Sequence, residues 1–370
     1  MLGLSADGRE QAGGSIELSF AGDEHLSRVL PLGLRVTRTD IQLGGTGADL
    51  VATDLNGDGS VDLAVVGMTE GATVGALSGG LLSVLYNNGD GTFRSPQTSD
   101  IPTQALSLKA VDLTGDARPE LVATGAGDNF SLLSNGGTGP AGAPSPISNA
   151  TGQVSGACVS GSDPHSLAVA DFNGDGFDDV IVGASSSDSG GSKSGSSYVV
   201  LGKASGFGAH IDLSSLDGSN GFRLDGERIK DQSGWSVSSA GDFNGDGYGD
   251  LIIGSYARND YSAQNYVIFG KASGFAAQID LANLLSDEGF RIESEARNEF
   301  FGWNVSGGGD INGDGLDDLI IGSPEDGLNP QIAYNTNYVI FGSRNFSGDG
   351  ELPEITGTDA DNSLKGSEAA

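Results

Sequence analysis

The sequence contains little cysteine, little positive charge and no long apolar run. Cys158 is the only cysteine among 370 residues, so the chain can form neither an internal disulfide nor a zinc site built from cysteines. Lysine and arginine number 18 against 50 acidic residues, which leaves a formal net charge of −32. Such a chain cannot neutralise phosphate groups, and we therefore expect no nucleic-acid partner and no binding to an anionic membrane surface.

The apolar segments are short and the N-terminus is polar. The longest apolar runs, such as LAVVGM and LIIGS, reach about a third of the length of a membrane-spanning helix, so no membrane span is expected. The first residues, MLGLSADGREQAGG, lack the basic segment followed by an apolar segment that marks a standard signal peptide. These features predict a soluble protein.

Glycine and aspartate are abundant, and they recur in one pattern. The stretch DFNGDGYGDLIIGS (242–255) represents it, and the five copies begin at Asp54, Asp112, Asp171, Asp242 and Asp310. The segments 198–247 and 266–315 are identical at 27 of their 50 positions without a gap. This recurrence predicts a duplicated structural module of about 60–70 residues.

Each module is predicted to be β structure. Short segments such as VDLAVVG, YVVLGK and NYVIFG are rich in β-branched and aromatic residues and are bounded by Gly, Asn, Asp and Ser. The segment IDLANLLSDEGF is the nearest approach to one or two helical turns. Four strand-like segments per module are typical of a β-propeller blade, and such blades must stack to bury both faces. We therefore predict an all-β β-propeller of four-stranded blades with five legible repeats.

The spacing of polar residues within the pattern points to a cation. Each complete copy has Asp at positions 1, 5 and 9, Asn at position 3 and Gly at position 6. Alternate side chains of a curled loop point inward, and Gly at position 6 allows the positive φ of a sharp turn. The carbonyl of position 7 would then face the ion. Ca²⁺ takes about six to eight oxygen ligands, and such a loop supplies most of them.

The spacing of the loop also resembles two other structures. An EF-hand requires Glu at position 12 and flanking helices, but the chain has Val65, Val182, Ile253 or Ile321 there, so an EF-hand is excluded. A solvated Asn-Gly or Asp-Gly turn without metal remains the alternative, although an Asp at position 9 has no role in a simple turn.

The second copy departs from the pattern. It carries Thr114 at position 3, Ala117 at position 6 and Glu120 at position 9. Arg118 and Pro119 stand between these last two. We expect a weak or empty site formed by Asp112, Asp116 and Glu120.

The chain contains the stretches FGWNVSGGGDINGDG (301–315), SGWSVSSAGDFNGDG (233–247) and LLSVLYNNGDGTF (81–93). The first two resemble the FG-GAP repeat, the blade repeat of integrin α-subunits and of many bacterial surface proteins, and the third resembles a related bacterial version. The resemblance covers residues 49–343 and implies about four Ca²⁺ sites, each in the hairpin loop between the first two strands of a blade. The implied side-chain ligands are Asp54, Asn56, Asp58 and Asp62; Asp171, Asn173, Asp175 and Asp179; Asp242, Asn244, Asp246 and Asp250; and Asp310, Asn312, Asp314 and Asp318. The implied backbone ligands are the carbonyls of Ser60, Phe177, Tyr248 and Leu316.

The two ends of the chain differ from the repeats. Residues 1–48 contain the strand-like SIELSF and LRVTRTDIQL, which predict an extra or closing blade and hence six or seven blades if the ring closes. In the tail, 344–370, the stretch GTDADNSLKGSEAA resembles the lead-in to RTX-type calcium repeats. An ordinary flexible polar C-terminus is the alternative for this segment.

The resemblance implies a calcium-stabilised adhesion or recognition module, extracellular or at the cell surface of a bacterium. A protein or glycan ligand would bind the face opposite the calcium loops, where Tyr256, Arg258, Tyr261 and Tyr334 suit such contacts or are merely solvated. Trp235 and Trp303 recur at one position and are expected to pack between blades.

A non-enzymatic protein is predicted, because His25, His165 and His210 stand in unrelated contexts and no nucleophile motif is present. The alternatives are a polysaccharide-active propeller lyase or hydrolase, and an architectural spacer of a large surface protein.

Overall fold

The computed structural model describes most of the repeat region and parts of both ends of the chain. The described residues are 2–4, 18–20, 39–40, 45–69, 80–101, 104–126, 130–135, 147–148, 166–207, 211, 213–256, 264–293, 300–324, 336–344, 355–356 and 363–367. Their regular structure is β-strand, apart from two short 3-10 helices at Leu213–Ser215 and Leu281–Asn283. No helix within these ranges is long and apolar enough to cross a membrane. The prediction of an all-β fold is confirmed.

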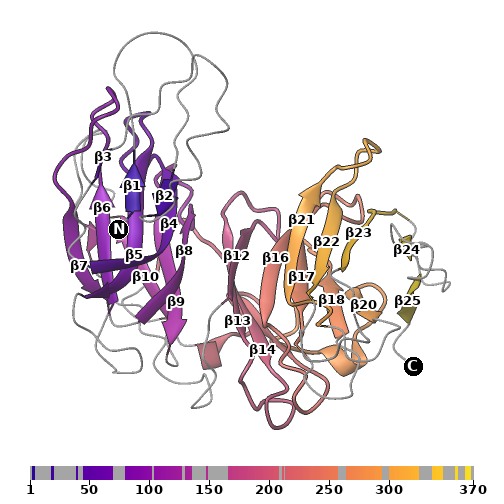
Figure 1. The fold of residues 1–370 in the computed structure, drawn as a ribbon. Coiled ribbons are helices and arrows are strands. Elements are labelled where there is room, and N and C mark those ends of the chain that lie inside the picture. The colour runs from indigo at the N-terminus through magenta and orange to yellow at the C-terminus, as the bar shows by residue number, and fades with distance from the viewer. Residues whose placement is uncertain are drawn as a thin grey trace.

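From Gly45 onward the strands form five successive sheets, antiparallel except for one parallel strand, which we number as blades 1 to 5 (Figure 1). Blade 1 contains β4 (Gly45–Thr53), β5 (Asp62–Thr69), β6 (Gly80–Leu85) and β7 (Gln97–Ile101). Blade 2 contains β8 (Gln104–Val111), β9 (Glu120–Ala126), β10 (Phe130–Asn135) and β11 (Ile147–Ser148). Both blades place their four strands in chain order, which confirms the four-stranded blade that the sequence predicts.

Blades 3 and 4 contain additional strands, and blade 5 shows three. Blade 3 is formed by β12 (Ser166–Ala170), β13 (Asp179–Ala184), β14 (Ser196–Val200) and β15 (Gly221–Asp225), with β19 (Gln278–Asp280) added in parallel. Blade 4 is formed by β16 (Ser236–Gly241), β17 (Asp250–Gly254), β18 (Gln264–Ile268) and β20 (Gly289–Glu293), followed by β25 (Ser363–Ser367) and β24 (Ile355–Thr356). Blade 5 is formed by β21 (Asn304–Gly309), β22 (Asp318–Ser323) and β23 (Thr336–Ile340).

The N-terminal strands form a small sheet of their own. They are β1 (Leu2–Leu4), β2 (Leu18–Phe20) and β3 (Thr39–Asp40), in the order β2-β1-β3. These strands lie in the segment for which the sequence predicts an extra or closing blade. The two C-terminal strands, β24 and β25, lie in the tail 344–370. An additional blade and the RTX-like character of the tail stay predictions.

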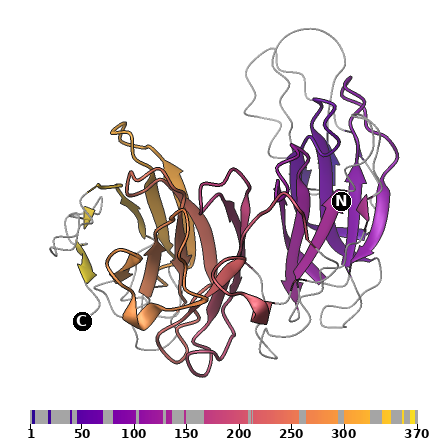
Figure 2. The same cartoon turned by 180° about the vertical axis from the view of Figure 1, so that it is seen from behind.

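The blades follow one another as in a β-propeller. The first strand of each blade contacts the first strand of the next, in the order β4, β8, β12, β16 and β21. Figures 1 and 2 show the sheets along an arc in this order, from purple to orange. Among the described strands, β21 makes no comparably extensive contact with β4. Closure of the ring therefore stays a prediction.

The hydrophobic core lies between neighbouring blades. On β5, Ala64 and Val66 pack into one cluster with Leu108 and Leu121 of blade 2, whereas Leu63 belongs to a separate cluster with other blade 1 residues. Similar clusters join blades 2 and 3, blades 3 and 4, and blades 4 and 5. Each large apolar side chain buried there contributes about 1.5–3 kcal/mol. Both faces of a second strand are covered, which explains continuous apolar runs such as LIIG.

Blade 5 exposes positions that are covered in blade 4. Phe243, the second residue of the acidic loop in blade 4, is 0 % exposed, whereas its counterpart Ile311 is 49 % exposed. Phe269, which follows the third strand of blade 4, is 6 % exposed, whereas its counterpart Phe341 is 39 % exposed. The contacts of blade 4 with blade 5 account for the difference, because blade 5 has no following blade among the described residues.

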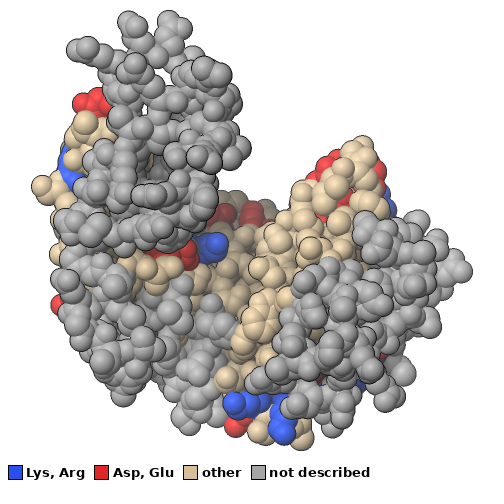
Figure 3. Space-filling model, viewed as in Figure 1, with Lys and Arg blue, Asp and Glu red and all other residues tan. Residues whose placement is uncertain are grey.

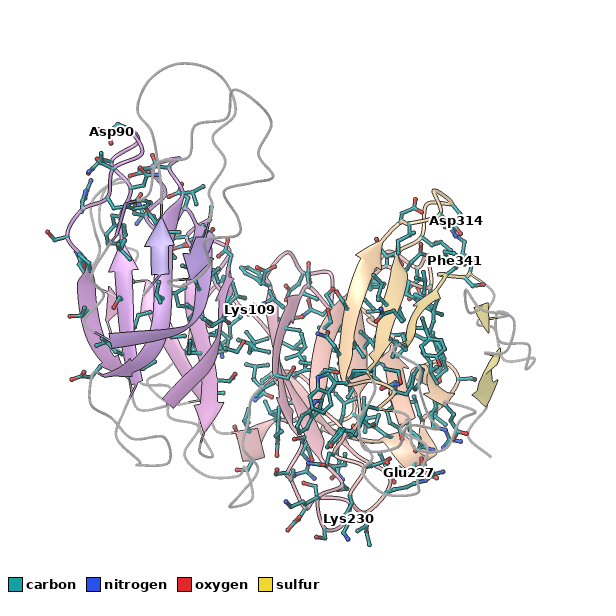
Figure 4. All side chains as sticks on the ribbon, in the orientation of Figure 1. Asp90, Lys109, Glu227, Lys230, Asp314 and Phe341 are labelled. Atoms are coloured by element: carbon teal, nitrogen blue, oxygen red, sulfur yellow. The ribbon has the colours of Figure 1, made fainter. Side chains whose placement is uncertain are left out.

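All acidic loops lie at the same end of the blades. Each of them leaves the first strand of its blade and enters the second, so the alternation of strand direction places them together. The connections between blades leave the fourth strands at the opposite end. Figure 4 shows this separation, with Asp314 of the last acidic loop at one end and Glu227 and Lys230 of the connection between blades 3 and 4 at the other.

Candidate metal centres

Every acidic segment forms the hairpin loop between the first and second strands of its blade. We name them loop 1 (54–62), loop 2 (112–120), loop 3 (171–179), loop 4 (242–250) and loop 5 (310–318). Figure 3 shows carboxylates gathered at the tip of the β21–β22 hairpin, which is loop 5. The loops therefore lie at the position in the blade that the sequence resemblance implies.

The Asp at position 1 folds the loop around its own carboxylate. In loop 1, Asp54 Oδ1 accepts hydrogen bonds from the N–H groups of Gly57 at 2.8 Å and Asp58 at 3.1 Å, and Asp54 Oδ2 accepts one from Gly59 at 2.7 Å. The three equivalent bonds of loop 5 measure 2.6, 3.0 and 2.9 Å. The side chains at position 1 thus point into the loop.

The side chains at positions 3 and 5 also turn inward. Asn173 Nδ2 donates to Asp175 Oδ2 at 2.9 Å, and the corresponding bonds in loops 4 and 5 measure 2.9 and 2.8 Å. The oxygen of the same Asn accepts the backbone N–H of position 5 at 3.0 Å in loop 3. Positions 1, 3 and 5 are therefore brought together, as alternate side chains of a curled loop should be.

Two residues with positive φ, in the left-handed backbone region, produce the curled shape of each loop. In loop 1 the φ angles of Gly57 and Gly59 are +72° and +84°. Loop 2 places Ala117 at the second of these positions with φ of +61°. A side chain in this region costs on the order of 1–2 kcal/mol, because Cβ approaches the backbone. This strain adds to the altered ligands that already make loop 2 the weakest candidate.

The Asp at position 9 has a role that the sequence did not reveal. It is fully buried in loops 1, 3, 4 and 5 and accepts one backbone N–H from position 2 and one from beyond the third strand. In loops 4 and 5 it also accepts the N–H of position 3. The four pairs of donors are Leu55 and Asn87 to Asp62, Phe172 and Gly202 to Asp179, Phe243 and Gly270 to Asp250, and Ile311 and Gly342 to Asp318.

These bonds correct the expectation that an Asp at position 9 has no role in a simple turn. The carboxylate fastens the loop to the third strand of the same blade, so it matters to the hairpin even without metal. Its second donor lies 20 to 25 residues away, and the local spacing of the motif carries no sign of it.

Burial makes the carboxyl groups of Asp62, Asp179 and Asp250 difficult to ionise. Loss of solvent, with a smaller contribution from the carboxylates of their own loops, raises the pKa of Asp179 and of Asp250 to about 7. Burial likewise raises the pKa of Asp62, and that of Glu120 in loop 2 to about 7. A positive charge beside these groups would favour their ionised forms. The electrostatics of the loops therefore suit a cation.

The loops offer oxygen donors of the kind that a hard cation binds. Asp242 Oδ1 is buried without a hydrogen-bond partner, and such an orphaned oxygen is a candidate ligand for a hard cation. Among the described residues, however, no three Asp, Glu, His or Cys side chains are arranged to hold a metal ion. Amide and carbonyl oxygens would have to complete a site, and several loop oxygens are directed at backbone N–H groups. The residues fit Ca²⁺ by oxygen chemistry.

Some of the residues singled out from the sequence lie at the end of the blades opposite the acidic loops. Tyr256 is buried and stacks against Trp235 and Phe300, with ring centroids 4.6 and 5.2 Å apart. The centroids of Trp235 and Trp303 lie 5.1 Å apart, which confirms packing between blades 4 and 5. Arg258, Tyr261 and Tyr334 and the three histidines lie outside the described residues.

Comparison with known proteins gives the same repeat structure. The FG-GAP repeat model matches residues 164–200, 233–268 and 301–340, and the FG-GAP-like repeat model matches residues 54–123. These matches include loops 1 to 5.

Similar proteins include integrin α-subunits. Integrin alpha-PS5 of Drosophila melanogaster is 32 % identical over 168 residues, which are 43 % of this chain and 15 % of the integrin. Integrin alpha-6 of Gallus gallus is 27 % identical over 165 residues, 44 % of this chain and 14 % of that protein. Integrin alpha-7 of Homo sapiens is 32 % identical over 162 residues, 44 % of this chain and 12 % of that protein. The similarity thus spans about a seventh of the length of these relatives. The chain therefore contains FG-GAP repeats in blades 3 to 5 and FG-GAP-like repeats in blades 1 and 2.

Proposed function

We propose that this protein is a calcium-binding β-propeller that recognises a protein or glycan ligand outside the cell. One observation carries the proposal: four hairpin loops at equivalent positions of successive FG-GAP blades have the same Asp and Asn residues at positions 1, 3, 5 and 9. A single loop of this kind would be an ordinary turn. Four loops that keep the same acidic set, in spite of their mutual repulsion, favour a shared cation ligand.

The side chains at positions 1, 3, 5 and 9 and the carbonyl of position 7 would hold the ion. In loop 4 these are Asp242, Asn244, Asp246, Asp250 and the carbonyl of Tyr248. Ca²⁺ would supply the positive charge that the loop lacks, and four ions would offset eight of the 32 formal negative charges. The protein itself supplies the curled backbone and the anchor to the third strand.

Loop 2 is proposed to bind calcium weakly or not at all. Thr114 replaces the amide at position 3, and Glu120 replaces the Asp at position 9 with a longer side chain. Glu120 Oε2 still accepts the N–H of Leu113 at 3.0 Å, so this side chain keeps the anchoring role. The loop therefore retains its fold through hydrogen bonds and packing.

The ligand is proposed to bind at the end opposite the acidic loops. Connections on a rigid β scaffold are where binding residues usually lie. The integrin α relatives support an adhesion or recognition role and a location outside the cell. Calcium sites of extracellular modules typically have dissociation constants of about 10⁻⁴–10⁻³ M, and such sites are filled only where calcium is abundant.

Thermal unfolding with and without calcium tests the metal sites. The melting temperature in EDTA is expected to fall well below that in millimolar Ca²⁺, and Mg²⁺ should restore less of it. Each site held at one hundred times its dissociation constant adds about 2.7 kcal/mol. Asp246→Ala should lose part of the calcium response, while Asp287→Ala, which removes an exposed acid elsewhere, should keep all of it. Identical melting curves in EDTA and Ca²⁺ would reject the sites.

A separate measurement tests recognition. Binding to an array of glycans and matrix proteins is expected in Ca²⁺ without any change in the bound molecules. Cleavage of a polysaccharide in a panel of lyase and hydrolase assays would instead support the enzymatic alternative. A folded, calcium-loaded protein that binds nothing on either panel would support the architectural spacer.

A further inference from the structure

Neighbouring acidic loops are joined by a reciprocal pair of hydrogen bonds. Asp317, at position 8 of loop 5, donates its N–H to the carbonyl of Asp242, at position 1 of loop 4, over 3.3 Å. Asp317 Oδ2 accepts the N–H of Asp242 in return over 2.8 Å. Gly241 makes this approach possible, because it has φ of +66° and a Cβ there would overlap the Asp317 carboxylate. The side chain at position 8 thus holds the backbone of the preceding loop.

The same arrangement joins loops 2 and 3. The N–H of Asp178, at position 8 of loop 3, donates to the carbonyl of Asp112 at 3.1 Å. Asp178 Oδ2 accepts the N–H of Asp112 at 3.0 Å. Since Asp112 begins loop 2, position 8 again fastens position 1 of the loop before it. The repetition shows that the contact belongs to the interface between blades rather than to one loop.

The other two interfaces provide an internal comparison. Position 8 of loop 4 is Gly249, whose N–H donates to the carbonyl of Asp171 at 3.3 Å, but glycine has no carboxylate to accept the bond in return. Position 8 of loop 2 is Pro119, which has no N–H to donate to loop 1. The full reciprocal pair is therefore present only where position 8 is Asp.

A side chain from each loop also covers the loop before it. The residue at position 7 lies over the glycine at position 4 of the preceding loop: Leu316 over Gly245, Tyr248 over Gly174 and Phe177 over Gly115. The carbonyl of this same residue is a proposed calcium ligand. The segment at positions 7 to 9 thus contributes both to its own metal site and to the contact with its neighbour.

We propose that Asp317 is a positioning residue that couples metal occupancy between loops 4 and 5. The inference rests on the proposed calcium sites. Asp317 stands between Leu316 and Asp318, which both offer ligand oxygens in loop 5. A cation that orders this segment orders Asp317, and Asp317 then fixes the backbone of Asp242, the first ligand of loop 4. Binding at loop 5 therefore strengthens binding at loop 4, and linkage makes the effect reciprocal.

Terbium luminescence measures the affinity of loop 4 in the full chain. Tb³⁺ replaces Ca²⁺ at oxygen sites, and the ring of Tyr248 in loop 4 would sensitise its emission. The part of the signal that Tyr248→Phe removes reports loops 3 and 4, because the ring of Tyr248 also lies over Gly174 of loop 3. The fraction of that part which Asp246→Ala removes belongs to loop 4. Asp314→Ala, which takes a ligand from loop 5, is expected to weaken terbium binding at loop 4 about five-fold, at the lower end of known couplings between sites.

A double-mutant cycle assigns the coupling to Asp317. Asp317→Ala alone should weaken loop 4 by a similar factor, and adding Asp314→Ala to it should have little further effect. Asp317→Asn should retain the coupling, because its amide oxygen can accept the same N–H from Asp242. Asp287→Ala removes an exposed acid elsewhere and should leave the affinity of loop 4 unchanged. Melting curves in EDTA show whether each variant is folded.

The outcomes separate this inference from the calcium proposal. If wild type gives neither a Tyr248-dependent terbium signal nor stabilisation by calcium, the calcium sites themselves are rejected. If it binds terbium but Asp314→Ala leaves loop 4 unchanged, only the coupling is overturned. Effects of Asp314→Ala and Asp317→Ala that multiply, or an Asp317→Asn variant that behaves like Asp317→Ala, would also overturn the positioning role. The Asp314→Ala measurement needs no change at Asp317, so it holds even if Asp317→Ala fails to fold.

Discussion

The ring of Tyr248 in loop 4 lies over Gly174 in loop 3, so that a Cβ on Gly174 would come within 2.9 Å of two ring carbons. Gly174 also has φ of +68°. Gly174→Ala is therefore expected to lose about 1–2 kcal/mol through backbone strain and more through displacement of the ring. Denaturant unfolding in Ca²⁺ measures the loss.

Gly176 in the same loop is the matched control for this substitution. Its φ is +86°, but no heavy atom lies within 4 Å of the place where a Cβ would stand. Gly176→Ala should therefore show the strain alone. Equal losses in the two variants would mean that the contact between Tyr248 and loop 3 contributes no stability.

Substitutions at positions 5 and 9 of loop 4 should separate the structural role of one Asp from the metal-binding role of the other. Asp250→Ala leaves the buried N–H groups of Phe243 and Gly270 without acceptors, at about 1–3 kcal/mol for each. Asp246 is exposed, and Asp246→Ala should cost little in EDTA. In Ca²⁺ both variants should lose the stabilisation contributed by loop 4. Equal stability of the two variants in EDTA would contradict the anchoring role of Asp250.

The buried carboxyl of Asp231 is expected to make stability depend on pH. Asp231 lies in the connection between blades 3 and 4, is 1 % exposed, and its Oδ2 has no hydrogen-bond partner. Burial raises its pKa from 3.8 to about 7, although Arg228 nearby lowers it. The folded protein thus holds a proton that the unfolded chain releases near pH 4. The stability from this group is complete below about pH 4 and is lost as pH rises through about 7.

Melting temperatures in saturating Ca²⁺ from pH 5 to pH 8 check this expectation. Wild type should lose stability with rising pH, and Asp231→Asn should lose less, because the amide does not ionise. Asp287→Asn changes an exposed acid and should retain the wild-type slope. An Asp231→Asn variant with the same slope as wild type would show that this carboxyl does not titrate as its burial requires.

Local patterns in the sequence were sufficient to predict the blades and the loops. The acidic motif sets the hairpin because its glycines, such as Gly57 and Gly59, must take positive φ, and its Asp and Asn oxygens accept N–H groups a few residues away. The apolar runs after each loop predicted buried strands correctly. These features depend on neighbours in sequence, so a single chain reveals them.

Contacts between blades could not be predicted in this way. Asp242 and Asp317 are 75 residues apart, and Asp112 and Asp178 are 66 apart, so no local spacing links them. The parallel strand β19 was also missed, because its segment resembled a helical turn. The structure has only the 3-10 helix Leu281–Asn283 after it, with Asp280 accepting the N–H of Ala282 as its N-cap.

Strand β19 bears on how the protein would respond to tension. It leaves blade 4 between that blade's third and fourth strands and pairs with β15 of blade 3, with Leu224 opposite Ile279. Gln278 Nε2 also donates to Asp225 Oδ2 at 2.7 Å, and the rings of Phe222 and Phe275 stack with centroids 4.5 Å apart. A pull that separates the two blades must shear this pairing as well as peel the core apart. Under tension, blades 3 and 4 should therefore stay paired and unfold together in one event.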